Sequence, residues 1–168
     1  MNWGKIVNAF KEHLVPSYGS AQAPGVPQTN YIQKPFIPTT QVSSQPMGWP
    51  DILNFGINKA KNFGMSPAVV AGQMADESGR GTSKLATQNN NFFGYGASGP
   101  GMGNAFSSPQ ESVDAYFRLL QTPRYTNAWR VRNNPNLMLR ELINAGYNTA
   151  NPNYYNEISG TPEWRNNL

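Results

Sequence analysis

The chain has 168 residues, of which 38% are hydrophobic and 12% aromatic, so it can bury a core and is not wholly disordered. Its net charge of +4 attracts polyanions, but the basic residues are scattered and no zinc-finger, zipper or RNA-binding signature occurs, so nucleic acid is not an expected partner. The absence of cysteine and the single His13 exclude disulfides, thiolate zinc sites, cysteine nucleophiles and a Ser-His-Asp triad.

The chain opens with apolar residues at helical spacing, which predict an amphipathic helix over residues 1–14. Such a helix either docks on a membrane or partner protein, or packs back onto its own domain, and the pattern does not choose between them. Charged side chains at Lys5, Lys11 and Glu12 interrupt the segment, so no cleavable secretion signal is expected.

Residues 15–48 are rich in Pro, Gly, Ser, Gln and Thr, and repeated prolines prevent regular helices and central strands. This composition predicts an extended linker that tethers a compact domain at residues 49–168.

Within the compact domain, a capping residue followed by proline marks the start of several helices. These pairs are Ser66-Pro67, Ser108-Pro109, Asn134-Pro135 and Asn151-Pro152. Further helices are expected over residues 51–62 and 125–130, and Gly79 can end the helix that begins at Pro67. No strong strand pattern occurs, and at most a small hairpin or irregular lobe is expected over residues 92–106. The domain is therefore predicted to be mainly α-helical.

The helix that begins at Pro67 carries two consecutive acids. At about 100° per residue, Glu77 falls between Val70 and Met74 on the apolar side, whereas Asp76 points toward solvent. Apolar neighbours favour the neutral form of a carboxyl group, and a carboxylic acid that keeps its proton near neutral pH can donate it. Glu77 is thus a candidate general acid; the structural alternative is a partly buried carboxylate that bonds to backbone amides or Arg80.

Motifs that include and follow Glu77 occur in a fixed order. They are Glu77-Ser78-Gly79-Arg80-Gly81-Thr82-Ser83, Asn90-Asn91-Phe92-Phe93-Gly94, Ser108-Pro109-Gln110-Glu111-Ser112, Pro123-Arg124-Tyr125 and Gly146-Tyr147-Asn148-Thr149-Ala150-Asn151-Pro152-Asn153-Tyr154. The set, over about residues 66–158, resembles the glucosaminidase family of bacterial and phage peptidoglycan hydrolases, of the autolysin and flagellar-hydrolase type. The corresponding family motifs read Glu-Ser-Gly-x-Gly-x-Ser, Asn-Asn-Leu-Phe-Gly, Ser-Pro-Glu-Glu-Ser, Arg-Tyr and Gly-Tyr-Ala-Thr-Asp-Pro-x-Tyr.

The resemblance implies a lysozyme-like helical fold with a reduced β lobe, and cleavage between N-acetylglucosamine and N-acetylmuramic acid in peptidoglycan glycan strands. Glu77 matches the family's catalytic acid, and Tyr147 matches a tyrosine that contributes to catalysis; a core aromatic is the local alternative for Tyr147. Six further residues are expected to bind substrate, with a structural role equally open for the first three: Asn91, Phe92, Gly94, Tyr95, Tyr125 and Tyr154. No metal or organic cofactor is implied.

Two features depart from the family pattern. The tyrosine motif holds an extra residue before Pro152, which leaves the register of Tyr154 open. No Asp or Glu occurs from Ser78 through Gln110, where the family often carries a second carboxylate, and this stretch is instead Gly-rich. Glu111 occupies a capping-box position after Ser108 and Asp114 lies in the same helix, so neither is an expected second catalytic acid.

One carboxylate permits two mechanisms. Either the N-acetyl oxygen of the substrate attacks the anomeric carbon, as in a substrate-assisted glucosaminidase, or a sugar hydroxyl replaces water, as in a lytic transglycosylase. The motifs favour the glucosaminidase, with a transglycosylase or muramidase as the alternative and a non-catalytic cell-wall module as a third reading. An anchor helix, a tether and a wall-cleaving domain suggest a virion-associated lytic enzyme of a phage, with residues 1–14 contacting a virion or membrane component.

Overall fold

The computed structural model describes residues 47–96, 103–148 and 150–168. The predicted amphipathic helix at residues 1–14, nearly all of the predicted linker and most of the Gly-rich stretch lie outside the described residues.

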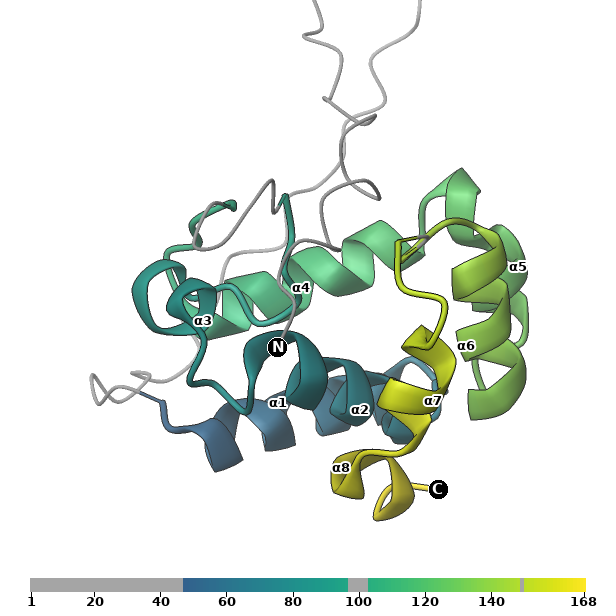
Figure 1. The fold of residues 1–168 in the computed structure, drawn as a ribbon, viewed down its shortest axis with the longest axis horizontal. Coiled ribbons are helices and arrows are strands. Elements are labelled where there is room, and N and C mark those ends of the chain that lie inside the picture. Colours follow the sequence, from purple (N-terminus) through teal and green to yellow (C-terminus); the bar gives the residue numbers. More distant parts are fainter. Residues whose placement is uncertain (1–46, 97–102, 149) are drawn as a thin grey trace, which may run out of the picture. The chain divides into compact units, whose positions relative to one another are not determined.

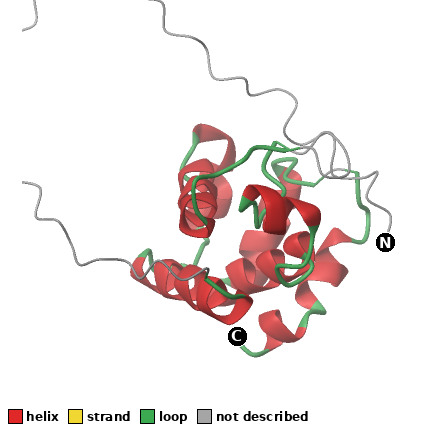
Figure 2. Cartoon of the chain, turned by 90° about the vertical axis from the view of Figure 1, so that its left-hand side faces the viewer, coloured by secondary structure: helices red, strands yellow, loops and turns green. Residues whose placement is uncertain are grey.

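The described part of the chain folds into short helices joined by tight turns (Figure 1). In chain order these are α1 (Trp49–Asn62), α2 (Pro67–Ser78), α3 (Lys84–Asn89), α4 (Pro109–Leu120), the 3-10 helix η2 (Pro123–Tyr125), α5 (Thr126–Arg130), α6 (Pro135–Asn144), α7 (Tyr154–Ser159) and α8 (Pro162–Arg165). Figure 2 shows helices and loops and no strand in the described segments. The mainly α-helical prediction is confirmed, and the described residues between Phe92 and Phe106 form bends and turns.

Three of the four predicted helix starts are confirmed. Proline occupies the first turn of α2, α4 and α6, where no amide proton is needed. The Ser108 hydroxyl accepts a hydrogen bond from the Glu111 amide, and the Asn134 side chain accepts one from the Leu137 amide. Ser66 differs, because its side chain makes no cap hydrogen bond at the start of α2.

The prediction of a helix starting at Pro152 is wrong, because α7 begins only at Tyr154. The Asn151 side chain accepts a hydrogen bond from the Asn153 amide at 3.0 Å, which closes a turn instead of capping a helix. An Asn-Pro pair signals either arrangement, since asparagine oxygens bond to amides two or three residues ahead. The short helices α3 and α8 were not predicted.

Helix α2 is the centre of the core and packs against α1, α6, α7 and α8. Two glycines permit close contacts between α2 and its neighbours. A Cβ on Gly56 of α1 would lie 2.7 Å from the sulfur of Met74, and a Cβ on Gly72 of α2 would lie 3.1 Å from the carbonyl oxygen of Ile158 in α7. Because Gly72 lets α7 approach the backbone of α2, the side chains of α7 reach the carboxyl-terminal end of α2.

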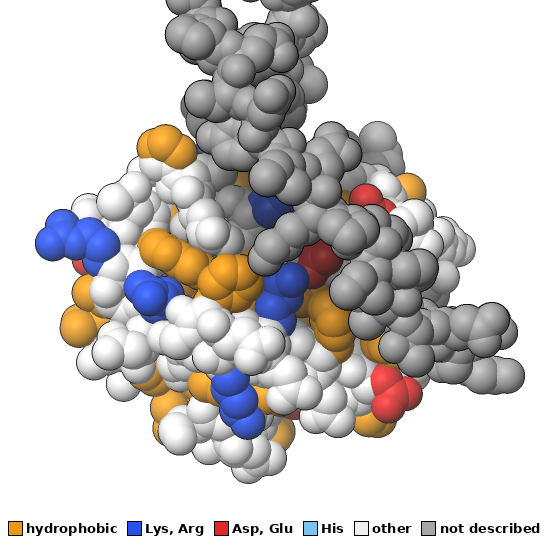
Figure 3. Space-filling view, turned by 180° about the vertical axis from the view of Figure 1, so that it is seen from behind, with side chains coloured by type: hydrophobic (Ala, Val, Ile, Leu, Met, Phe, Trp, Pro, Cys, Tyr) orange, Lys and Arg blue, Asp and Glu red, His pale blue; other side chains and the backbone are white. Residues whose placement is uncertain are grey.

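The surface seen in Figure 3 carries Lys and Arg side chains in separate places among uncharged and apolar groups. No helix in the described segments is both long and apolar enough to cross a lipid bilayer.

Candidate active site

Glu77 lies in the last turn of α2 with its side chain inside the protein. Only 6% of it is exposed, whereas the adjacent Asp76 is exposed, so the predicted directions of both acids are confirmed. Val70 and Met74, which flank Glu77 on the helical wheel, are fully buried. The carboxyl group therefore sits at the edge of the hydrophobic core.

The surroundings of Glu77 favour its protonated form. Burial raises the pKa of the Glu77 carboxyl from 4.5 to about 8, and the hydrogen bond from Tyr154 opposes this rise. The negative charges of Asp76 and Glu157 raise the pKa of Glu77 further. With a pKa near 8, the carboxyl group is mostly neutral at pH 7 and has a proton to give.

Glu77 ends a chain of buried polar side chains that crosses three helices. The hydroxyl of Tyr154 on α7 donates to Glu77 Oε1 at 2.9 Å. That hydroxyl accepts a hydrogen bond from Gln73 Nε2 at 2.8 Å, and Gln73 Oε1 accepts one from the hydroxyl of Tyr116 on α4. All three partners are buried. This series of hydrogen bonds holds the Glu77 carboxyl in one orientation, with Tyr154 as its donor.

Tyr147 belongs to a cluster of four buried tyrosine rings beside Glu77. Its ring is 2% exposed and lies 6.1 Å from both Tyr125 and Tyr154 and 6.4 Å from Tyr116, measured between centroids. Burial raises the pKa of the Tyr147 hydroxyl well above 10, and the Glu77 charge adds to this effect. The hydroxyl therefore keeps its proton at neutral pH and can donate a hydrogen bond.

Backbone geometry at the end of α6 places Tyr147. Gly146 has a positive φ of 82°, its amide donates to Ile143, and the Tyr147 amide donates to Leu142, which together form a Schellman motif. The Arg124 guanidinium donates to the carbonyl oxygens of Ala145 at 2.7 Å and Gly146 at 3.0 Å. The Arg-Tyr and Gly-Tyr motifs thus form one unit, since Arg124 holds the turn and Tyr125 packs on Tyr147.

The turn after Glu77 has three consecutive residues with positive φ, namely Gly79, Arg80 and Gly81. Ser78 stabilises it, because the Ser78 hydroxyl donates to the Met74 carbonyl at 2.6 Å and accepts from the Gly81 amide at 2.9 Å. Arg80 leaves the turn to pair with Glu163 of α8 at 2.7 Å. The structural alternative in which Arg80 bonds to Glu77 is therefore not what the structure shows.

The Asn-Asn-Phe-Phe-Gly motif builds a loop. Asn91 is 0% exposed, and its side chain bonds to the backbone of Tyr95 in both directions and to the carbonyl oxygen of Asn104. Phe92 and Gly94 are buried, and Gly94 has a positive φ of 63°. Tyr95 is partly exposed, so it is more accessible to a substrate than Asn91, Phe92 and Gly94. Asn91 shapes the loop, since its polar atoms are already bonded.

The two acids that follow the Gly-rich stretch have structural partners. The Glu111 carboxylate accepts hydrogen bonds from the amide and hydroxyl of Ser107 at 2.6 and 2.7 Å. In a standard capping box the carboxylate would bond to the amide of the N-cap residue, Ser108, whereas here it bonds to the residue before it. Asp114 forms an ion pair with Lys59 of α1 at 2.5 Å. That neither acid serves as a second catalytic acid stays a prediction.

Sequence reasoning missed Gln73, Tyr116 and Glu157. Gln73 lies four residues before Glu77, on the same face of α2, and a polar residue in an otherwise apolar stretch was a usable signal. Tyr116 and Glu157 had no comparable local signal, because packing of separate helices brings them to the site. In the described segments, no three His, Cys, Asp or Glu side chains gather into a group able to hold a metal ion.

This arrangement can give and retake a proton at one carboxyl group held at the end of α2. The sequence model of the Glucosaminidase family, described as mannosyl-glycoprotein endo-beta-N-acetylglucosaminidase, matches residues 54–163. That span includes Glu77, Gln73 and all four tyrosines of the cluster. None of the curated proteins compared with the chain matches it.

Proposed function

The chain belongs to the Glucosaminidase family, and from that premise we propose that it is an endo-β-N-acetylglucosaminidase with Glu77 as its general acid. Membership makes the protein a glycosidase that acts on peptidoglycan, at the cell wall. The observation that carries the assignment of Glu77 is its buried carboxyl group with a pKa of about 8. A carboxyl group that is neutral at pH 7 can protonate the oxygen of a departing sugar.

In the proposed reaction, Glu77 transfers its proton to the glycosidic oxygen as the bond to the anomeric carbon breaks. The carbonyl oxygen of the substrate's N-acetyl group attacks that carbon from the opposite face, which replaces the second carboxylate. The Glu77 carboxylate then takes a proton from the water that opens the cyclic intermediate. Each proton given is thereby recovered, and the product ends in N-acetylglucosamine.

The tyrosines support Glu77 in distinct ways. Tyr154 bonds to the carboxyl oxygen and stabilises the carboxylate that forms after proton transfer. We assign Tyr147 to catalysis as a hydrogen-bond donor near Glu77, because its hydroxyl remains protonated. Tyr95 and Tyr125 are the proposed aromatic contacts for the glycan, with Phe92 and Gly94 shaping the loop beside them.

A lytic transglycosylase is the second candidate, and the engagement of Glu111 and Asp114 elsewhere favours it. Such an enzyme needs Glu77 but no carboxylate to activate water. A muramidase, the third possibility, would need that carboxylate, and the acids whose charges act on Glu77 are Asp76 and Glu157.

Analysis of the products separates these reactions. Purified peptidoglycan is digested, reduced with borohydride and examined by mass spectrometry, with Glu77→Gln as the control. We expect reduced N-acetylglucosamine at the new ends. Exclusive 1,6-anhydromuramic ends would establish the transglycosylase, and reduced muramic acid would establish the muramidase. Absence of any cleavage, checked as loss of wall turbidity, would identify a non-catalytic module.

We also propose that a phage particle delivers the enzyme, with residues 1–14 as the anchor to a virion or membrane component. The support is the order of segments along the chain, an amphipathic start followed by a Pro-rich stretch and a compact domain.

A further inference from the structure

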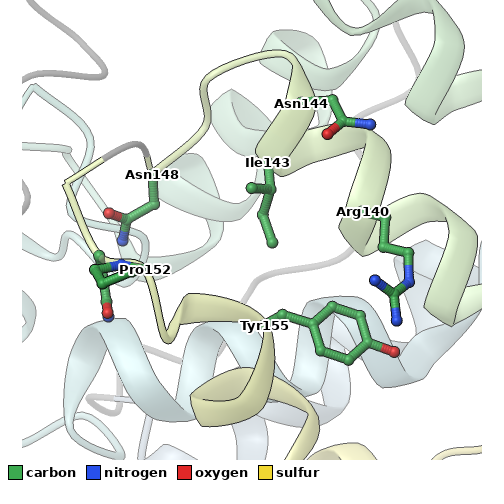
Figure 4. A pocket seen from close by; sticks show the side chains of 7 residues that line it. Arg140, Ile143, Asn144, Asn148, Pro152 and Tyr155 are labelled. Carbon is green, nitrogen blue, oxygen red and sulfur yellow. The ribbon is translucent and has the colours of Figure 1, made fainter.

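A pocket of about 530 Å³ lies between α6, α7 and the loop that joins them. Figure 4 shows α6 on one side, the loop with Asn148 and Pro152 on the other, and Tyr155 of α7 below. The described residues that line it are Arg140, Ile143, Asn144, Asn148, Asn151, Pro152 and Tyr155. None of them was expected to bind substrate from the sequence.

The described lining of the pocket carries a positive charge and no acidic side chain. Among the described residues that line it, Arg140 is the charged one, and its guanidinium lies 4.4 Å from the centroid of the Tyr155 ring. The ion pairs found among the described residues join Lys59 to Asp114 and Arg80 to Glu163, so they leave Arg140 available. A guanidinium held over a ring is well placed to bind a planar carboxylate.

Apart from the Tyr155 hydroxyl, which donates to Asn136, the other polar side chains of the described lining are the amides of Asn144, Asn148 and Asn151. Asn148 is 7% exposed, and its Oδ1 is buried without a hydrogen-bond partner. A buried acceptor left unpaired is costly, so nearly all such groups in folded proteins have a partner. Asn148 lines the pocket, so an N–H group of a ligand could donate to this oxygen if the amide rotated about its terminal bond.

Two residues that line the pocket are chain neighbours of tyrosines in the candidate active site. Asn148 directly follows Tyr147, and Tyr155 directly follows Tyr154, whose hydroxyl bonds to Glu77. A molecule bound in the pocket would therefore contact residues that are adjacent in sequence to Tyr147 and Tyr154. This adjacency points to another part of the same substrate as the occupant.

We propose that this pocket binds the peptide that peptidoglycan carries on its glycan strand, with Arg140 pairing with a peptide carboxylate and Asn148 accepting from a peptide N–H. The proposal rests on the proposed action on peptidoglycan. A neutral sugar fits less well, because sugars stack on open aromatic faces and Arg140 lies over the Tyr155 ring. Ile143 and Pro152 supply the apolar surface that an alanyl side chain contacts.

Binding is tested on the full chain with N-acetylmuramyl-L-alanyl-D-glutamate, which contains no bond between two sugars and is not turned over. The comparison ligands are its diamide, which lacks both carboxylates, and a chitin tetramer, which lacks the peptide. Dissociation constants and the NMR signals of the Asn148 side-chain amide are measured by titration. Arg140→Gln is compared with Arg130→Gln, which removes the same charge from an exposed arginine of α5 that does not line the pocket.

We expect the acidic muramyl peptide to shift the Asn148 signals, and Arg140→Gln to weaken its binding about fivefold to tenfold, as for one charge-assisted contact at a partly open site. Arg130→Gln should leave binding unchanged, and the diamide should bind the wild type as weakly as the acid binds Arg140→Gln. Equal binding of the chitin tetramer at these signals, or no saturable binding of the acid, would overturn the proposal. Because these measurements report binding at the Asn148 signals and not bond cleavage, either result stands apart from the test of the proposed function.

Discussion

Replacement of Glu77 by glutamine should remove the activity of the protein. It should also make the variant increasingly more stable than the wild type as the pH rises, because the wild type loses stability and the variant does not. The side chain keeps its shape but cannot ionise. In the wild type, the pKa of Glu77 is raised from 4.5 to about 8 by burial. Between these values the folded protein holds a proton that the unfolded chain releases, so the stabilising contribution of Glu77 is complete below pH 4.5 and is lost as the pH rises through 8.

The magnitude follows from the two pKa values, 4.5 and about 8. They differ by about 3.5, and at about 1.4 kcal/mol per pKa unit the wild type loses about 5 kcal/mol of stability over the full range. About 3 kcal/mol of this is lost by pH 7. A difference in unfolding free energy between Glu and Gln that does not involve ionisation is the same at every pH. The part of the difference that changes with pH therefore reports the ionisation of Glu77 alone.

The assay is urea unfolding of both proteins from pH 4 to pH 9. The stability of Glu77→Gln relative to the wild type should increase by about 3 kcal/mol between pH 4 and pH 7. Glu141→Gln, on α6, removes the same charge outside the site and controls for net charge. Lytic activity of Glu77→Gln should fall by about 10² to 10⁴. A stability difference that stays constant with pH would refute the view of Glu77 as a buried, neutral acid.

Four further predictions concern the supports of Glu77 and the anchor. Tyr154→Phe removes the hydrogen bond that lowers the pKa of Glu77, so the alkaline limb of the pH–activity profile should move to higher pH; an unchanged profile would contradict this role. The same variant leaves the Gln73 amide unpaired, which should lower the unfolding free energy in urea by about 1–3 kcal/mol. Tyr147→Phe keeps the ring and should lower turnover with little change in melting temperature, whereas a loss of stability alone would make Tyr147 a core residue. Arg124→Gln removes two contacts to the end of α6 and should lower the unfolding free energy by about 1–3 kcal/mol, with Arg130→Gln as an unaffected control. Deletion of residues 1–48 should leave cleavage of soluble wall fragments intact and abolish association with a particle or membrane in a sedimentation assay; an insoluble product would show that the segment belongs to the core.

Local patterns were enough to predict the helix that carries Glu77 and the direction of its side chain. Pro67 starts α2, Gly79 ends it in the left-handed region, and the periodicity between them separates buried Glu77 from exposed Asp76. Glu111 was likewise read as a capping residue. These features depend on residues within about one helical turn, whose relative positions the helix geometry sets. The motif order then sufficed to identify the family.

Tertiary packing alone decided what surrounds the acid. Tyr154 was expected to bind substrate, in an open register, yet the structure has it donating to Glu77, 77 residues away in the chain. Gln73 contributes to the site only because Tyr154 and Tyr116 reach it from α7 and α4, 81 and 43 residues away. Such contacts have no periodic signature, since they depend on how closely whole helices approach one another. Here α7 can approach α2 because Gly72 has no side chain between them. This close approach lets the Tyr154 hydroxyl reach the carboxyl group of Glu77.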